Sequence, residues 1–158
     1  MQELTPSAQR FQDRMAELGF SFHPVELPQG TRTSADAARA IHCDLCQIAK
    51  SIVFRSASGK PVIVIASGSN RIDEDKVEKL VREKVEKGGP EFVREHTGFA
   101  IGGIPPAGYP EKIRTFIDED LLKLKEIWGA AGNPNAVFKL TPEELLKLTG
   151  GEVADIRI

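Results

Sequence analysis

Two consecutive apolar segments, separated by a short polar turn, restrict the fold of this chain more than any other part of the sequence. The first spans 47–57 and the second spans 61–66, with Ser58-Gly59-Lys60 between them. Apolar segments rich in β-branched residues on both sides of a glycine-containing turn predict a β-hairpin. The unbroken run Val62-Ile63-Val64-Ile65 is typical of a strand buried on both faces. We therefore expect this hairpin at the centre of a sheet.

Helices and further strands are expected on both sides of the hairpin. Apolar spacing, capping residues and proline or glycine at the ends predict helices over 6–19, 33–43, 73–87, 90–96, 118–124 and 141–150. Further strands are expected over 20–27, 99–102, 112–117, 125–128, 136–140 and 153–158, with loops over 28–32 and 129–135. Because this alternation is too irregular for a doubly wound fold, residues 1–158 are predicted to form a single α+β (mixed α/β) domain. Its sheet is expected to be mixed, with roughly seven strands and helices outside.

Composition and charge limit the classes of partner. The chain has 158 residues, of which 41% are hydrophobic and 28% charged, as in an ordinary globular protein. No apolar run approaches the roughly 20 residues of a membrane helix, and the mixed polar start over 1–20 does not resemble a signal peptide. We therefore expect a cytoplasmic protein without a membrane partner. The net charge of −2 disfavours coating of duplex nucleic acid, but it is compatible with a pocket that grips a nucleic-acid end.

Most common catalytic motifs are missing from the sequence. It has no G-x-S-x-G elbow and no phosphate-binding G-x-x-x-x-G-K-[ST] loop. Cys43 and Cys46 form one C-x-x-C, but it follows a predicted helix, and the three histidines are scattered singly. We interpret the two cysteines as packing residues around the end of a helix, and we leave open whether they are thiols or a disulfide. No metal and no cofactor is expected.

A glycine- and proline-rich loop and one lysine remain as candidates. The stretch over 97–118 combines glycines at 98, 102, 103 and 108 with Pro105 and Pro106, and apolar segments flank it. Such a loop is either a tight turn or a rigid wall against a ligand. Lys50 begins a largely apolar strand, where its ammonium either reaches solvent along apolar surface or contacts a ligand. Asp118 either caps the following helix or faces the same site.

Four segments, taken together and in order, resemble the YbaK/ProX family. They are KSIVF at 50–54, TGFAIGGIPPAG at 97–108, TFID at 115–118 and GAAG at 129–132. The resemblance extends over nearly the whole chain. It implies a partly closed mixed sheet of the type found in the editing domain of prolyl-tRNA synthetases. It also implies a trans-editing aminoacyl-tRNA deacylase, which hydrolyses the ester of a wrong amino acid (Ala, Cys, Ser or Thr) on a tRNA such as tRNA(Pro).

The resemblance also assigns roles to residues. Lys50 matches the essential lysine of the family, and we expect it to act in catalysis with Gly102 and Gly103, whose main-chain N–H groups would stabilise an oxyanion. The expected substrate-binding residues are Ile104, Pro105, Pro106, Gly108, Asp118, Gly129, Ala130, Ala131, Gly132 and Asn133.

The implied partner is a misacylated tRNA, bound through its 3′ aminoacyl-adenosine, and an aminoacyl-tRNA synthetase is a further candidate partner. A non-catalytic module that binds aminoacyl-adenosine-like or nucleotide ligands in the same pocket is the alternative. Small residues at 130–132 would shape the amino-acid pocket, and the size of that pocket would exclude larger amino acids. The sequence leaves open which amino acid is removed.

Overall fold

The computed structural model describes residues 4–27 and 33–158, so the loop predicted over 28–32 lies outside the described residues. The helices are α1 (Pro6–Glu17), α2 (Ser34–Ile41), α3 (Glu74–Val81), α4 (Pro90–Thr97) and α5 (Pro142–Thr149), with 3-10 helices η1 (Leu45–Gln47) and η2 (Glu119–Lys123). The strands are β1 (Val25–Glu26), β2 (Ile48–Ser56), β3 (Pro61–Ser67), β4 (Val85–Lys87), β5 (Arg114–Asp118), β6 (Ile127–Ala130), β7 (Ala136–Leu140) and β8 (Glu152–Ala154).

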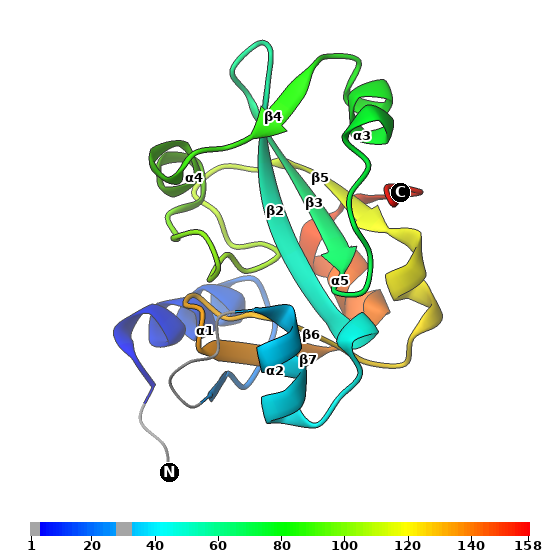
Figure 1. Ribbon diagram of the computed structural model, residues 1–158. Helices are drawn as coiled ribbons and strands as arrows, with labels where there is room; N and C mark the ends of the chain where they lie inside the picture. The colour runs from blue at the N-terminus through cyan, green and yellow to red at the C-terminus, as the bar shows by residue number, and fades with distance from the viewer. Residues whose placement is uncertain (1–3, 28–32) are drawn as a thin grey trace.

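The predicted hairpin forms the centre of the sheet, as Figure 1 shows for β2 and β3. The strand order is β1-β7-β6-β2-β3-β5-β8, and β4 pairs with β2 outside this path. The hairpin register places Ile52 opposite Val64. The β2–β6, β3–β5 and β5–β8 pairs are parallel and the other pairs are antiparallel. The prediction of a mixed sheet with helices outside is therefore confirmed.

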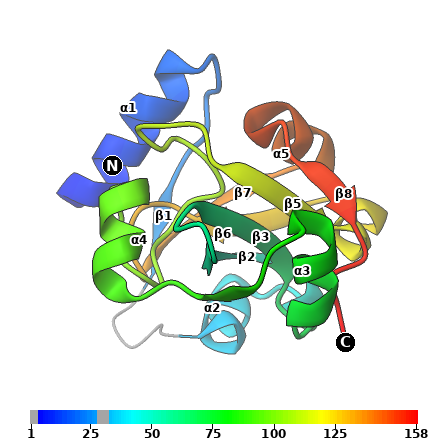
Figure 2. The same ribbon diagram turned by 90° about the horizontal axis from the view of Figure 1, so that it is seen from above.

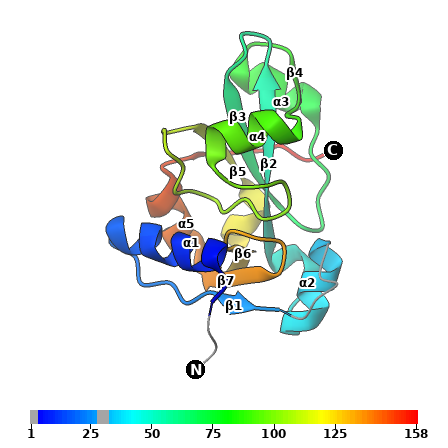
Figure 3. The same ribbon diagram turned by 90° about the vertical axis from the view of Figure 1, so that its left-hand side faces the viewer.

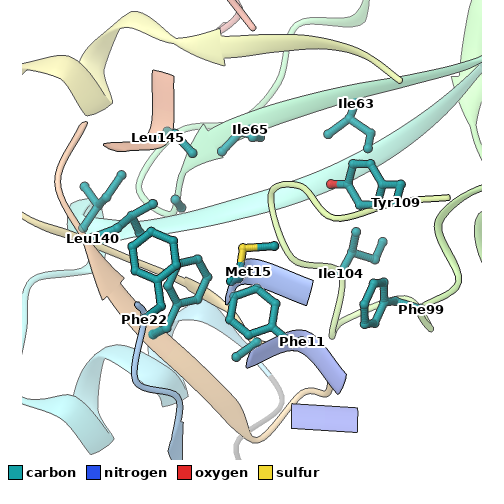
Figure 4. Close-up of a cluster of buried hydrophobic side chains, with 14 of the residues drawn as sticks. Phe11, Met15, Phe22, Ile63, Ile65, Phe99, Ile104, Tyr109, Leu140 and Leu145 are labelled. Atoms are coloured by element: carbon teal, nitrogen blue, oxygen red, sulfur yellow. The ribbon is translucent and has the colours of Figure 1, made fainter. Parts of the chain in front are cut away.

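Both faces of the hairpin are buried, each by a different set of helices. Ile63 and Ile65 face a large cluster that includes residues of α1, α4 and α5, part of which is drawn in Figure 4. Val62 and Val64 face a second cluster, to which α3 contributes Val77 and Val81. Figure 2 shows α1 and α5 on one side of the sheet and α3 on the other. This alternation explains why the strand is apolar at every position.

One edge of β2 is only partly paired. β3 pairs with β2 from Ala49 to Arg55. On the other edge, β6 pairs with Ile48 and Ala49, and β4 pairs with residues 54–56. Just beyond β4, Gly88 N–H donates to the Val53 carbonyl at 2.9 Å. Residues 50–52 therefore have no neighbouring strand of the described chain on that edge, which leaves an opening in the sheet between β6 and β4.

The helix predicted over 73–87 is wrong beyond Val81. Arg82 takes a left-handed conformation with φ of 66° and ends α3. The main-chain N–H of Val85 then donates to Glu78 Oε2 at 3.0 Å, and Val85 pairs with Ser56 in the sheet. The segment is a strand because β2 offers it an unpaired edge.

The strand predicted over 99–102 is also wrong. These residues form a turn, in which Gly103 N–H donates to the Ala100 carbonyl at 3.0 Å and Gly102 has φ of 94°. Gly129 and Ala130, predicted to lie in a loop, are instead the end of β6. Both differences bring glycine-rich backbone against the opening in the sheet.

Candidate functional site

A cavity of about 390 Å³ lies at the unpaired edge of β2. Its floor consists of β2 from Ile48 to Val53, and β6 and β4 supply opposite ends. The segment between α4 and β5 forms one wall, and α2 forms another. Figure 3 shows the segment after α4 lying beside β6. The cavity is thus built where β2, β4, β6 and β7 meet the segment after α4 and helix α2, and most of its lining is apolar.

Lys50 extends from the open edge of β2 at this cavity. It is half-buried, and no carboxylate of the described residues lies within ion-pair distance of its ammonium. Burial lowers the pKa of Lys50 below its ordinary value of 10.5, and Lys87 and Arg71 lower it further, while Asp118 opposes the shift. A cation that is partly desolvated and not neutralised by the protein is suited to bind an electron-rich or anionic group of a ligand.

Two glycine loops lie directly against each other beside the cavity. A Cβ atom on Gly103 would lie 2.4 Å from Asn133 Cα, so no side chain fits between the two backbones. Gly132 N–H donates to the Gly103 carbonyl at 3.1 Å and joins the loops. Gly102 lines the cavity, whereas Gly103 N–H is already bonded to the Ala100 carbonyl. Of the two expected oxyanion donors, Gly103 N–H is therefore engaged within its own loop.

The structure brings five of the predicted site residues together. Lys50, Gly102, Ile104, Gly129 and Ala130 all line the cavity. They come from β2, the segment after α4, and β6, which are distant in sequence.

The other predicted residues do not line the cavity. Asn133 Nδ2 donates to Thr5 Oγ1 and Ser7 Oγ, both at 2.9 Å, and so ties the second loop to the start of α1. Gly132 is required here because a Cβ would lie 2.5 Å from the Ser7 carbonyl oxygen. The Tyr109 hydroxyl donates to the Pro105 carbonyl. The remaining three also pack in the protein: Pro106 against Gly129, Gly108 against Met15, and Ala131 in the main core cluster.

Asp118 has a structural environment of its own. It is fully buried and accepts hydrogen bonds from Ser67 N–H at 3.0 Å, Asn70 Nδ2 at 2.8 Å and Asp120 N–H at 2.9 Å. The last of these caps η2, which agrees with the capping alternative. Asp118 therefore fixes the end of β5 against the β3–α3 turn, and its effect on Lys50 is electrostatic.

Three polar residues near the cavity were missed by sequence reasoning. Ser51 Oγ is buried, and it is the one buried side-chain nitrogen or oxygen atom of the described residues that has no hydrogen-bond partner. Its place beside Lys50 was the available signal. Arg71 and Lys87 gave no such signal, because Lys87 was expected in a helix and Arg71 in a loop.

Other possible sites find no support in the described part of the chain. Cys43 and Cys46 are free thiols, and burial raises the pKa of Cys43, with Asp44 adding to the shift. No three His, Cys, Asp or Glu side chains among residues 4–27 and 33–158 are grouped as a metal site requires. Within the same ranges, every helix is too short or too polar to cross a bilayer.

Comparison with known proteins agrees with this fold. The family model of the aminoacyl-tRNA editing domain matches residues 28–148. A crystal structure of a candidate trans-editing enzyme for prolyl-tRNA synthetase superposes with a TM-score of 0.95 and 45% identity, covering 99% of each chain. YwhH of Bacillus subtilis (strain 168) is 30% identical over 129 residues, 82% of each chain.

A candidate Cys-tRNA(Pro)/Cys-tRNA(Cys) deacylase of Enterococcus faecalis (strain ATCC 700802 / V583) is 26% identical over 125 residues, which are 78% of this chain and 76% of that protein. The family match covers most of the chain, and the fold agrees over its full length. The resemblance stated from the sequence is confirmed: the chain belongs to the aminoacyl-tRNA editing domain family, of the YbaK type.

Proposed function

We propose that this protein is a trans-editing deacylase that hydrolyses the ester between a wrong amino acid and the 3′ end of a tRNA. The observation that carries the proposal is the un-neutralised Lys50 ammonium at the rim of an apolar cavity whose opposite wall is glycine backbone. Membership of the editing-domain family supports the same activity. The proposed place of action is the cytoplasm, where aminoacyl-tRNA is used.

The proposed chemistry requires positioning rather than a side-chain nucleophile. A water molecule attacks the ester carbonyl, and the main-chain N–H of Gly102 stabilises the oxyanion that forms. Gly103 contributes by holding the loop, since its own N–H is bonded to Ala100. Lys50 binds the terminal adenosine near the ester and fixes the carbonyl relative to the attacking water. Because an aminoacyl ester is already activated, we expect this arrangement to suffice.

The apolar part of the cavity is the proposed pocket for the amino-acid side chain. Val93, Ile104 and Trp128 line it, together with Gly129 and Ala130 from β6. We propose Ala, Cys, Ser and Thr as the amino acids removed, on tRNA(Pro) or another tRNA, because size exclusion rejects larger side chains. The name of the Enterococcus faecalis relative refers to cysteine on tRNA(Pro) and tRNA(Cys). The trans-editing structure is described in relation to prolyl-tRNA synthetase, which makes that synthetase a proposed partner.

One observation favours a second candidate function. The described residues that line the cavity include no His, Cys, Asp or Glu that could serve as a general base. A module that binds aminoacyl-adenosine without hydrolysing it would need no general base in the cavity. We therefore keep non-catalytic binding as the alternative.

A panel of mischarged tRNAs tests the proposal. Ala, Ser, Cys and Thr esters on tRNA(Pro) and on their other cognate or near-cognate tRNAs are incubated with wild type, Lys50→Ala and Lys60→Ala. Lys60 is exposed at the far end of the same hairpin and serves as the charge-matched control. We expect hydrolysis by wild type and Lys60→Ala, and loss of at least about 100-fold in Lys50→Ala, as for a misplaced ester.

Calorimetry separates the two functions. Wild type is titrated with a non-hydrolysable aminoacyl-adenosine beside the deacylation assay. Binding without turnover of any ester in the panel would establish the binding module and exclude the deacylase. Turnover that survives in Lys50→Ala would remove the role assigned to Lys50.

A further inference from the structure

We infer that a second pocket, on the α3 face of the sheet, binds the phosphodiester backbone of the RNA strand that leads to the aminoacyl end, with Arg71 and Lys87 contacting phosphates. This inference rests on the proposed function, which supplies the RNA. The inference extends the proposed site from the ester to the RNA nucleotides that precede it.

The second pocket is a polar hollow of about 410 Å³. Ile52 and Phe54 of β2 form its floor, and Arg71 and Lys87 stand at its sides. Lys50 lines it as well. Three cationic side chains therefore share one hollow, which the acidic residues Asp73, Glu74 and Asp75 also line.

The two pockets are continuous around the open edge of β2. Lys50, Ile52 and Lys87 line both of them. Side chains alternate along a strand, so Ala49 and Val53 pack into the main core cluster while Ile52 and Phe54 pack on the α3 face. At residues 50–52 no strand of the described chain closes the edge between the two faces. An RNA strand whose aminoacyl end lies in the first cavity can therefore pass this edge of β2 and continue into the second pocket.

The cations in the second pocket lack protein partners. None of the ion pairs formed by the described residues includes Arg71, Lys87 or Lys50. Arg71 and Lys87 are exposed and lie near enough to Lys50 to act on its charge. Like charges that lie close together and form no ion pair repel one another, and an anion that binds between them relieves this repulsion. An RNA phosphodiester supplies such an anion at each nucleotide.

Acidic residues at the start of α3 limit where the phosphates can lie. Asp73 Oδ1 accepts the N–H groups of Asp75 and Lys76 at 3.0 and 3.4 Å, so its carboxylate is used as a helix cap. Glu74 and Asp75 are exposed at the same rim. Their charges repel a phosphate from α3, which leaves the side formed by β2 and β4, with Lys87, as the favourable path.

The test compares Arg71→Gln and Lys87→Gln with Lys79→Gln. Lys79 is an exposed cation on α3 that does not line the pocket, so it controls for the loss of one charge. The first measurement is the affinity for a single-stranded RNA oligonucleotide ending in CCA, determined by fluorescence anisotropy at a series of salt concentrations. We expect Arg71→Gln and Lys87→Gln each to weaken binding about tenfold and to reduce the salt slope by about 0.7, as for one lost phosphate contact on a single strand.

The second measurement separates RNA binding from chemistry. Arg71→Gln is assayed on a misacylated tRNA and on a 3′-aminoacyl-adenosine that carries no phosphate. We expect a raised KM on the tRNA with the same kcat, and equal rates on the aminoacyl-adenosine. The inference would be overturned if Arg71→Gln and Lys79→Gln lost the same affinity for the oligonucleotide, or if the salt slope of Arg71→Gln equalled that of wild type. If wild type hydrolyses neither substrate, the proposed function fails, but the oligonucleotide measurement still decides whether the phosphate site exists. If millimolar inorganic phosphate alone inhibits oligonucleotide binding, the pocket is a site for small anions and the inference is overturned.

Discussion

Substitution of Gly103 by alanine tests the idea that two loops, held against each other, set the shape of the cavity. The added Cβ would lie 2.4 Å from Asn133 Cα and 2.8 Å from its N and C atoms, whereas ordinary contact begins near 3.4 Å. Gly103 does not have a positive φ, so the effect comes from the contact and not from backbone strain. The two backbones must therefore separate by about 1 Å, the difference between the ordinary and the close contact.

That separation has an expected magnitude in stability and in activity. Overpacking of a buried contact costs about 1–3 kcal/mol, and the 3.1 Å hydrogen bond from Gly132 N–H to the Gly103 carbonyl would be lengthened. We expect the free energy of unfolding to fall by about 2 kcal/mol. Because a displacement of about 1 Å in a positioned site reduces rates by roughly 100-fold, kcat for deacylation should fall by about that factor.

Urea unfolding and steady-state deacylation measure the two effects. Gly89→Ala is the matched control, because its Cβ would meet nothing within 4 Å and its φ is −73°. It should cost at most about 1 kcal/mol through a weaker helix cap and should leave kcat unchanged. If Gly103→Ala matched Gly89→Ala in both measurements, the cavity wall would not depend on the contact between the loops.

Three further substitutions probe single interactions. Lys50→Met should raise the free energy of unfolding near neutral pH, because the lowered pKa of Lys50 means that the unfolded chain holds this proton more tightly than the folded chain does. This gain in stability should shrink as the pH approaches 10.5. Urea titrations of both proteins at several pH values would measure it. Asp118→Asn should cost about 2–3 kcal/mol in the same assay, since an amide cannot accept all three hydrogen bonds; a raised KM at unchanged stability would instead indicate contact with substrate. Tyr109→Phe should cost about 1–2 kcal/mol because the buried Pro105 carbonyl loses its donor. This loss should be the same at neutral and mildly alkaline pH in thermal unfolding, since burial raises the pKa of Tyr109.

The parts of the fold that were predicted correctly depend on local signals. The capping box of Thr141 and Glu144 at the start of α5, and the proline that begins α1, act over one helical turn and can be read directly. The segment after Val81 could not be assigned in this way. Val81 and Val85 are four residues apart, which fits a helix, but Val85 pairs with β2, about 30 residues earlier in the chain.

The candidate site shows the same division. Lys50 and the loop with the glycines at 102 and 103 were candidates from their residues alone, and the resemblance to a family motif then assigned their roles. Arg71 and Lys87 belong to no such motif, and the pocket that they share is formed where β4 and the segment before α3 lie beside β2. Non-local strand pairing of this kind leaves no pattern in the sequence around either residue.

The open edge of β2 also bears on solubility during folding and storage. Unpaired strand edges recruit strands from other molecules and so promote aggregation. Here the free stretch over 50–52 spans only about 10 Å at the usual rise per residue, and β6 and β4 block it at both ends. That length is below the five or six residues of a typical strand, and the lysine at position 50 places a charge on it. The protein can therefore keep main-chain groups available to a ligand without offering its neighbours a template for cross-chain pairing.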